Sequence, residues 1–392
     1  MKILYLTPRL PYPIDKGDKL RAFYQIKYLS KNHDIFLLSL DETLTDKLND
    51  NPVKNFCKKI IVFPLTRYKI FFNLFRKIFS SVPFQTAFYY NPRIKKEILK
   101  AINDIRPDII FCQLIRAAEY VIEIKNIPKI IDYVDIISKG LERRASKSNL
   151  LMKFLIKIEF NRVRNYEKKV FKEFDNSIII SREDRNFLPF EEKENVKIVP
   201  NGIDLEYFYP MESEKEYDLF FSGNLNYPPN VDASIYIVKN ILPLLLKRKP
   251  DIKILIAGAS PNKKILSLVS RNVIVKGWVD DIREFYKKAK IFIAPMQLGT
   301  GLQNKLLQAM AMKIPCVTSE LTMKGLAEGA EKVLLVAKKP LDYSELVIKL
   351  LEDDNYRNSI AQRGYEFVQI NYRWEKIIEN LEEIIQTTIN KK

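Results

Sequence analysis

The sequence has one histidine and three cysteines, too few for several kinds of site. The cysteines, Cys57, Cys112 and Cys316, lie far apart and form neither a CxxC pair nor an even disulfide framework. We therefore expect a reducing compartment, the cytoplasm. His33 precedes an expected strand and is interpreted as a solvated residue. A histidine-dependent triad and a zinc site are thereby excluded.

Long apolar runs are also absent. No run of about 18 apolar residues occurs, which excludes a membrane-spanning helix. The apolar run at residues 1–8 is too short for a secretion signal. With 47% apolar and 29% charged residues, the composition fits a soluble globular protein, and the length of 392 residues predicts two domains.

Positive charge is abundant and unevenly placed. Residues 1–200 hold 38 Lys and Arg against 24 Asp and Glu, a net +14, whereas residues 201–392 hold 27 against 24, a net +3. Residues 51–100 alone hold eleven basic residues and one acid, Glu97. We expect the first half to face an anionic partner or to carry a solvated basic face.

Residues 67–79 alternate basic with large apolar side chains. Their phenylalanines fall at helical spacing, which predicts an amphipathic helix: Phe71, Phe72, Phe75 and Phe79. These rings would enter either the protein core or an anionic membrane interface. A second basic helical surface over residues 147–172 favours the membrane slightly. Nucleic acid is not an expected partner, because no recognised nucleic-acid-binding module occurs.

Short apolar runs alternate with helical patterns along the whole chain. In the first half we expect strands near residues 2–6, 34–40, 59–63, 109–113, 129–132 and 176–180. After a turn at residues 200–202 the pattern restarts, with strands near residues 217–222, 251–257, 272–275, 291–295 and 316–319. The alternation predicts an α/β protein with two doubly wound parallel sheets and a hinge near residues 200–212. In such folds ligands bind at the carboxyl ends of the strands, here in a cleft between the domains.

A glycine loop follows the expected strand 291–295 and leads into a helix. It runs through Gly299, Thr300, Gly301, Leu302, Gln303 and Asn304. Lys305 then opens the helix, with Gln308 one turn later. Free backbone amides and the positive end of a helix dipole hold phosphate, and the lysine adds a full charge. The pattern predicts a diphosphate site; the alternative is an ordinary turn that needs glycine for backbone freedom.

The loop between the first strand and the first helix is a second candidate. Gly17 allows a ligand to approach the backbone closely, and Lys19 and Arg21 could reach phosphate or an anionic acceptor. The alternative is a solvated loop in which Asp18 caps the helix.

Two acidic residues at the end of the strand near 129–132 form a third candidate. Asp132 and Asp135 could orient sugar hydroxyls or a reacting group. They could equally be a turn aspartate and a helix cap.

Glycines also end the first strands of the second half. Gly223 and Asn224 follow one strand, Gly258 the next, and Val279 lies beyond the third. Backbone groups there could read the edge of a base. Trp278, beside Val279, is interpreted as a core residue.

Taken together, these motifs resemble glycosyltransferase family 4, and the resemblance covers almost the whole chain. It is closest to bacterial sugar transferases of exopolysaccharide systems. The matching segments are residues 11–13 with 16–21, 132–135, 199–204 with Phe208, 222–224 with 229–232, 301–312 and 371–374.

The resemblance implies the GT-B fold, with two Rossmann-like domains facing each other across a cleft. It implies an acceptor domain at residues 1–205, a donor domain at 206–372, and a helix at 373–392 that crosses back onto the first. The expected activity is retaining transfer of a sugar from a nucleotide sugar, without a metal. The acceptor would be a lipid-linked saccharide or polysaccharide at the inner face of the cell membrane.

Residue roles follow from the same resemblance. Lys305 and the loop amides from Thr300 to Asn304 would neutralise the donor diphosphate, and Gly17 would lie near it from the other domain. Asp135 or Asp132 would contact the reacting sugar or the acceptor. In this family retention is usually explained by front-face attack, in which the leaving phosphate helps to accept the proton.

The chain departs from the family pattern at several positions. Glutamate is usual at position 308, where it holds the ribose hydroxyls, and an acid is frequent at position 300; here Gln308 and Thr300 stand instead. Residues 224–226 lack the usual basic pair. A catalytically weakened binding partner in glycan assembly is therefore the alternative function, and a sugar-nucleotide epimerase is disfavoured because acid/base side chains are scarce.

Overall fold

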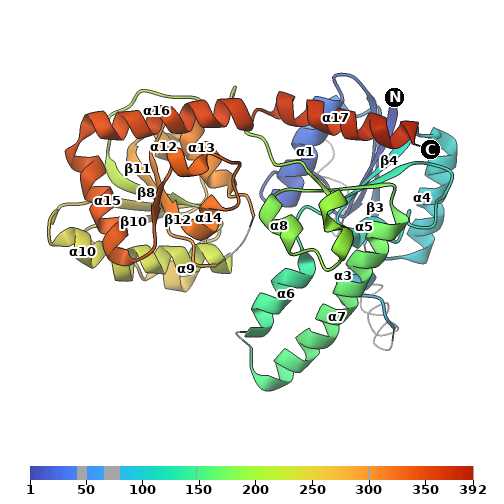
Figure 1. Cartoon of the computed structure of the whole chain (residues 1–392), viewed down its shortest axis with the longest axis horizontal. Coiled ribbons are helices and arrows are strands. Elements are labelled where there is room, and N and C mark those ends of the chain that lie inside the picture. The colour runs from blue at the N-terminus through green and yellow to red at the C-terminus, as the bar shows by residue number, and fades with distance from the viewer. Residues whose placement is uncertain (42–50, 66–79, 147, 299–300, 392) are drawn as a thin grey trace. The chain divides into compact units, whose positions relative to one another are not determined.

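The computed structural model describes residues 1–41, 51–65, 80–146, 148–298 and 301–391. The chain divides into two compact units, each built on a parallel sheet (Figure 1). Unit 1 comprises Met1–Pro200 together with Ile377–Lys392, and unit 2 comprises Asn201–Lys376. Within the described residues, no helix has both the length and the apolar character needed to cross a bilayer.

Unit 1 contains a seven-stranded parallel sheet in the order β3-β2-β1-β4-β5-β6-β7. Buried β-branched and aliphatic side chains fill its strands, as expected for a sheet covered on both faces. The strands are β1 (Lys2–Thr7), β2 (Asp34–Asp41), β3 (Lys59–Pro64), β4 (Ile109–Gln113), β5 (Lys129–Asp132), β6 (Asn176–Ile179) and β7 (Lys197–Ile198).

Helices connect these strands. α4 shows how the sequence sets a boundary: Asn91 caps it by accepting from the Arg93 amide at 2.9 Å, and Pro92 occupies the first turn. The helices are α1 (Gly17–Leu29), α3 (Phe84–Tyr89), α4 (Pro92–Ile105), α5 (Ile115–Ala118), α6 (Ile137–Ser146), α7 (Leu150–Glu173) and α8 (Arg182–Asn186), with 3-10 turns η2 (Pro52–Phe56) and η3 (Glu191–Asn195).

Unit 2 repeats the strand order with six strands, β10-β9-β8-β11-β12-β13. In both units the first strand in sequence has the second on one side and the fourth on the other, so both sheets have a topological switch point. The strands are β8 (Tyr217–Ser222), β9 (Ile254–Ala257), β10 (Val273–Lys276), β11 (Ala289–Ala294), β12 (Cys316–Ser319) and β13 (Leu335–Ala337).

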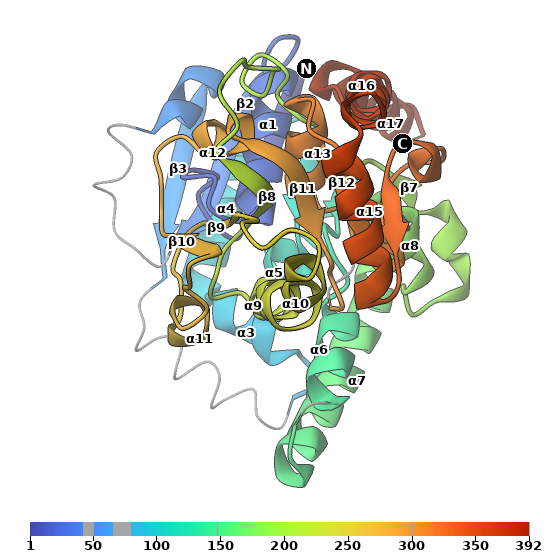
Figure 2. The same ribbon diagram turned by 90° about the vertical axis from the view of Figure 1, so that its left-hand side faces the viewer.

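The helices of unit 2 surround its sheet, as the view in Figure 2 also shows. In sequence order they are α9 (Pro228–Tyr236), η4 (Ile237–Ile241), α10 (Leu242–Leu246), α11 (Lys263–Leu266), α12 (Arg283–Lys287), α13 (Asn304–Ala311), α14 (Glu320–Met323), η5 (Ala330–Lys332), α15 (Pro340–Glu352) and α16 (Asp354–Asn371). The expected α/β class with two doubly wound parallel sheets is confirmed.

The last helix, α17 (Trp374–Asn390), belongs to unit 1 from Ile377 onward. Asn32 Nδ2 donates to Glu382 Oε1 at 3.1 Å, and His33 Nε2 lies 3.0 Å from the same oxygen. The His33 side chain is only 10% exposed, which corrects its interpretation as a solvated residue. Since it contacts α17, its role there is structural.

Candidate functional site

The carboxyl ends of β8 and β11 mark the switch point of unit 2. The glycines that follow β8 and β9 pack against each other there. Gly258 has φ +147°, and a Cβ added to it would lie 1.8 Å from the Gly223 carbonyl oxygen. Gly223 has φ +153°, and its added Cβ would lie 2.6 Å from Asn230 Nδ2. Both positions therefore require glycine for close backbone packing, whatever ligand they meet.

Asn230 ties this loop to the first turn of α9. Its Nδ2 donates to the carbonyl of Asn224 at 2.9 Å, which fixes the loop after β8 and leaves the Asn230 Oδ1 facing another partner. The residue itself is buried, whereas Asn224 is exposed.

That partner is Lys305, in the first turn of α13. Its Nζ donates to Asn230 Oδ1 at 2.5 Å and lies 4.6 Å from the centre of the Phe221 ring. Both contacts are with neutral groups, and none of the described carboxylates forms an ion pair with this ammonium. Burial lowers the pKa of Lys305 from 10.5 to about 7. A partly buried cation without a counter-ion is set to gain from an anionic ligand.

Gln308 lies one turn further along α13 and is held by Tyr286 of α12. The Tyr286 hydroxyl is 3.1 Å from Gln308 Oε1, 3.1 Å from the Lys305 carbonyl and 2.9 Å from the Ser222 hydroxyl. A phenol has one proton, so the Tyr286 hydroxyl donates either to Gln308 Oε1 or to the Lys305 carbonyl oxygen. It accepts a hydrogen bond from the Ser222 hydroxyl. Burial raises the pKa of Tyr286, so the phenol stays protonated.

The glycine loop before α13 is described from Gly301 onward; Gly299 and Thr300 lie outside the described residues. Gly301 has φ +79°, and its carbonyl oxygen would lie 2.5 Å from a Cβ on Gly325. Leu302 and Gln303 are partly exposed, and Gln303 makes no side-chain cap. The side chain of Asn304 accepts from Asn201 Nδ2 at 3.3 Å.

The remaining predicted donor residue, Val279, follows β10 and is half-buried. Its neighbour Trp278 is 67% exposed, so the interpretation of Trp278 as a core residue is wrong. Trp278 lies on the surface beyond β10 and does not contribute to the interior of unit 2.

In unit 1, Arg21 and Asp132 are paired with each other inside the protein. Arg21 Nε donates to Asp132 Oδ2 at 2.6 Å, and both side chains are 0% exposed. Gln25 Nε2 donates to the same oxygen at 3.3 Å, and the Val134 amide donates to Oδ1 at 3.0 Å. These placements correct the expectation that Arg21 reaches phosphate and that Asp132 contacts a sugar, because neither side chain is accessible.

Asp135, by contrast, is exposed at the end of the turn that follows β5. Its amide donates to the Tyr133 carbonyl at 2.7 Å across Val134, whose φ is +62°. Although solvent reaches the residue, desolvation raises the pKa of its carboxyl; nearby Arg116 opposes that rise and Asp18 adds to it.

Gly17 begins α1 and is exposed, and nothing lies within 4 Å of a Cβ added to it. Lys19 pairs with Asp15 one turn earlier, with Nζ 2.9 Å from Oδ1. Gly17 is open to solvent, whereas the Lys19 side chain is only 15% exposed; the predicted roles of both residues stay predictions.

Two arginines near Asp135 escaped the sequence analysis. Arg9 Nη1 contacts Asp18 Oδ2 at 3.0 Å, and Arg116 Nη2 donates to Gln85 Oε1 at 2.8 Å. They come from different strand ends with no shared motif, so no local pattern could single them out. Among the described residues, no three His, Cys, Asp or Glu side chains gather as a metal-binding group.

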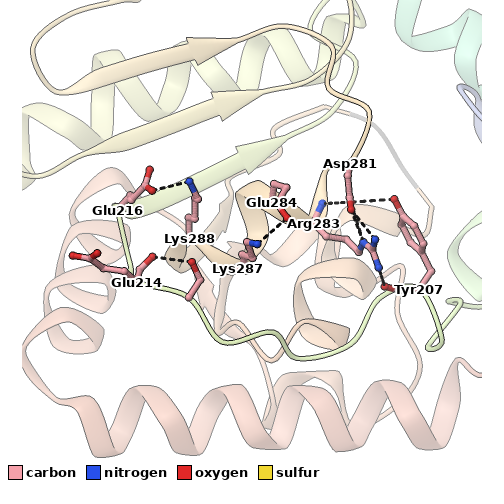
Figure 3. A network of polar contacts seen from close by, with 9 residues as sticks. Tyr207, Glu214, Glu216, Asp281, Arg283, Glu284, Lys287 and Lys288 are labelled. Atoms are coloured by element: carbon pink, nitrogen blue, oxygen red, sulfur yellow. Dashed lines mark hydrogen bonds and ion pairs between the residues drawn. The ribbon is translucent and has the colours of Figure 1, made fainter.

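A second polar cluster in unit 2, around α12, differs from the Lys305 site because its labelled cations, Arg283, Lys287 and Lys288, each pair with a carboxylate (Figure 3). Arg283 Nη2 contacts Asp281 Oδ2 at 2.7 Å, and its guanidinium carbon lies 3.9 Å from the centre of the Tyr207 ring. Arg283 Nη1 also donates to the Tyr207 carbonyl at 2.9 Å. The contacts of Tyr207 with Asp281 and Arg283, and of Glu216 with Lys288, hold residues 207–216 against the segment around α12.

Comparisons with known proteins point to one protein class. Residues 216–353 match the family model described as Glycosyl transferases group 1. Over 407 residues the chain is 23% identical to an uncharacterized 44.6 kDa protein in the cps region of Klebsiella pneumoniae, across 97% of this chain and 98% of that protein. An uncharacterized glycosyltransferase of Methanocaldococcus jannaschii is 22% identical over 348 residues, 84% of this chain and 80% of that one.

Among solved structures, HepE of Anabaena in complex with UDP-glucose is similar over 99% of this chain and 100% of that chain. The TM-score is 0.68 at 13% identity. This likeness establishes the fold, GT-B, with two Rossmann-like domains that each contain a parallel sheet. The segment that matches the family model lies inside unit 2 and contains every residue of the predicted donor site.

Proposed function

We propose that the chain is a nucleotide-sugar-dependent glycosyltransferase that acts in cell-surface polysaccharide biosynthesis. Unit 2 binds the donor, and unit 1 binds a lipid-linked saccharide or polysaccharide acceptor at the inner face of the cell membrane. The observation that carries the proposal is the ammonium of Lys305, held by neutral groups at the switch point of unit 2.

The comparisons support this proposal at a coarser level. The family model that matches residues 216–353 is one of glycosyl transferases, HepE was solved with UDP-glucose, and the Klebsiella relative is encoded in a cps region. A nucleotide sugar supplies the diphosphate that a partly buried cation without a counter-ion would neutralise.

Lys305 stabilises the charge that develops on the leaving diphosphate as the bond from phosphate oxygen to the sugar breaks. Backbone amides at the start of α13 add to this charge stabilisation. The Gln308 carboxamide, oriented by Tyr286, hydrogen-bonds the ribose.

On the acceptor side, Asp135 accepts a hydrogen bond from a hydroxyl of the reacting sugar or of the acceptor. Its raised pKa suits a hydrogen-bond acceptor for a hydroxyl. The reaction retains the anomeric configuration, because attack occurs on the face from which the diphosphate leaves and a phosphate oxygen takes the proton. No metal and no nucleic acid take part.

A weakened binding partner is the second candidate, and Gln308 is the residue that favours it. A neutral amide binds ribose hydroxyls less strongly than the carboxylate usual in the resembling family. Such a protein would bind a nucleotide sugar without turnover, or would bind none.

Isothermal titration calorimetry with a panel of uridine, guanosine and thymidine diphosphate sugars tests the donor assignment. We expect one donor to bind, and Lys305→Met to lose about 10- to 100-fold in affinity, as for a charge-assisted contact. Lys324→Met is the matched control, because Lys324 lies in the same unit and pairs with Glu320 at 3.2 Å. Equal loss in both variants, or none in Lys305→Met, contradicts the role of Lys305.

Transfer is tested separately by mass spectrometry of products after incubation with the bound donor and a membrane extract. A glycosylated lipid or saccharide product supports the transferase, and chelation of divalent metals is expected to leave its yield unchanged. Donor binding without any product, under conditions where a control transferase works, favours the weakened partner.

A further inference from the structure

The start of α7 carries an unusual cluster of exposed apolar side chains. Within the nine residues from Leu150 to Ile158, six are large, apolar and exposed, out of seventeen such residues in the described chain. Their exposed fractions are 88% for Leu150, 74% for Leu151, 43% for Met152, 62% for Phe154, 52% for Leu155 and 37% for Ile158. A contiguous apolar patch of this kind marks a binding surface rather than random surface composition.

The patch lies on the outer side of the helix. At about 100° per residue, positions 150, 151, 154, 155 and 158 share one side of α7. The opposite side packs inward through Ile156, Glu159 and Val163, which are buried. An ordinary surface helix turns its apolar side to the core; this one also presents an apolar side to solvent.

The cluster sits where α6 and α7 meet, at the end of a helical pair. In Figures 1 and 2 these two helices extend beyond the rest of unit 1, with the start of α7 at the far end. Asn149 caps α7 there, with Oδ1 accepting from the Met152 amide at 3.0 Å. The apolar side chains at the tip are therefore free to meet a surface outside the protein.

Charge at this tip is of one sign. Among the described side chains between Glu142 and Glu159, three are basic and none is acidic: Arg144, Lys153 and Lys157. Lys153 and Lys157, one helical turn apart, are exposed and flank the apolar stripe, and neither forms an ion pair within the described part of the chain.

Two of the three carboxylates of α7 are withdrawn from the surface, and the third, Glu173, ends the helix and pairs with Lys125. Glu159 lies 3.4 Å from the Gln85 amide, and Glu167 accepts from the Ser138 hydroxyl at 2.6 Å; both residues are buried. The exposed side of α7 therefore carries only positive charge from Leu150 to Lys172.

We propose that the tip of the α6–α7 pair is a membrane-docking surface that inserts into the interface of an anionic bilayer. The occupant is a lipid surface because the apolar stripe is wide and flanked by unpaired lysines. Such a pattern matches acyl chains beneath anionic headgroups. This inference goes beyond the transfer reaction, and vesicle binding tests it without any donor.

Sedimentation with vesicles measures this docking. We expect the full chain to bind vesicles containing phosphatidylglycerol about tenfold or more tightly than vesicles of phosphatidylcholine alone, as two or more lysines near an anionic surface predict. The triple variant Leu151→Ser, Phe154→Ser, Leu155→Ser is expected to lose binding to both. Lys153→Gln with Lys157→Gln is expected to lose only the preference for the anionic lipid.

Leu266→Ser with Val269→Ser is the matched control, because these exposed apolar residues lie in unit 2, near α11. All three altered side chains of the triple variant are more than half exposed, so its circular dichroism and melting temperature are expected to match the parent. A vesicle affinity that the triple variant keeps, or that the control loses equally, overturns the proposal.

A second copy of the chain is the rival occupant of the patch. Analytical ultracentrifugation without lipid distinguishes the two. A parent that dimerises through the patch, together with a monomeric triple variant and unchanged vesicle binding, overturns the membrane assignment. As a direct check, Phe154→Trp is expected to shift its emission to the blue on anionic vesicles; an unshifted emission on bound vesicles also contradicts the proposal.

Discussion

The two units have the same strand order, but they differ in how a cation near the carboxyl ends of the strands is compensated: by a carboxylate in unit 1 and by neutral groups in unit 2. In unit 1 a buried arginine is neutralised within the protein, since Arg21 and Asp132 lie 2.6 Å apart and both are 0% exposed. In unit 2 the cation is Lys305, whose neighbours are the amide oxygen of Asn230 and the ring of Phe221.

This difference separates a structural charge from one that is available to a ligand. A paired and buried ion contributes to the integrity of its unit, and its removal leaves a partner without compensation. A cation with only neutral neighbours destabilises its own unit slightly and gains when an anion arrives. The shared fold therefore gives no guide to which switch point binds a ligand; the side chains decide.

The largest expected effect comes from removing one charged side chain in each unit, Asp132 in unit 1 and Lys305 in unit 2. Asp132→Ala leaves the Arg21 guanidinium buried without its carboxylate, and we expect unit 1 to lose about 3–5 kcal/mol in its free energy of unfolding. Lys305→Met removes a cation without a counter-ion, and we expect unit 2 to be unchanged or slightly more stable. Urea denaturation measures the free energy of unfolding of both variants. Tryptophan emission reports the unfolding of unit 2, because Trp278 and Trp374 both lie there, and hydrogen exchange of β1 and β4 reports that of unit 1.

The double variant Arg21→Met with Asp132→Leu is the control for the first change. Since it removes both charges, it is expected to lose less stability than Asp132→Ala alone. The proposed difference between the units is contradicted if the Asp132→Ala protein is as stable as the parent. It is also contradicted if unit 2 of the Lys305→Met protein is unfolded.

The second expected effect is a pH dependence of donor binding that arises from Lys305 of unit 2. The pKa of Lys305 is about 7 in the free protein, and a bound diphosphate raises it by favouring the ammonium form. Below about pH 7 the lysine is already charged and affinity is flat. Above it each binding event must take up a proton, so affinity falls by up to about tenfold per pH unit.

Calorimetry in buffers of different ionisation enthalpy counts the protons taken up. We expect close to one proton per donor bound at pH 8 and few at pH 6, with no such uptake in Lys305→Met. Affinity that stays constant between pH 6 and pH 9 contradicts the lowered pKa.

A smaller effect on donor affinity is expected from Gln308→Glu, which places a carboxylate at the proposed ribose contact of unit 2. A carboxylate gives ribose hydroxyls a charge-assisted hydrogen bond, which is stronger by about 1 kcal/mol, so donor affinity should rise about fivefold. Gln303→Glu is the matched control for a general effect of negative charge near α13. If both changes weaken the donor equally, Gln308 does not hold the ribose.

The smallest expected change in stability belongs to Gly17 of unit 1. Because nothing lies within 4 Å of an added Cβ, Gly17→Ala should alter the free energy of unfolding by less than about 0.5 kcal/mol. If the donor phosphate approaches this backbone closely, the added methyl group lowers the rate of transfer. Turnover equal to that of the parent would remove Gly17 from the proposed site.

Much of the fold was predictable because it rests on local periodicity. The apolar runs at residues 2–6 and 217–222 lie in β1 and β8, and the glycine loop leads into α13 with Lys305 in its first turn, as expected. The predicted amphipathic helix at residues 67–79 lies outside the described residues. The exposed Trp278 shows the limit of such reasoning, since an indole after a strand carries no local signal of which side of the fold it faces.

The site was less predictable than the strands. Lys305 was identified because it is adjacent in sequence to its loop, whereas Tyr286 was missed because its contact with Gln308 spans 22 residues and begins on another helix. Asp132 and Asp135, three positions apart, looked equivalent; the turn at Val134 directs one into the protein and leaves the other exposed.

The sequence by itself determined the alternation of strands and helices, the restart after residue 200 and the lysine at the start of α13, since each depends on neighbours along the chain. Only the tertiary structure decided which charges are paired. Arg21 meets Asp132 across 111 residues because parallel strands bring distant segments to one edge of the sheet. At the corresponding edge of unit 2, Lys305 meets none of the carboxylates that the structure describes. Whether a charged side chain supports the fold or awaits a ligand is set by such distant partners, which no local pattern records.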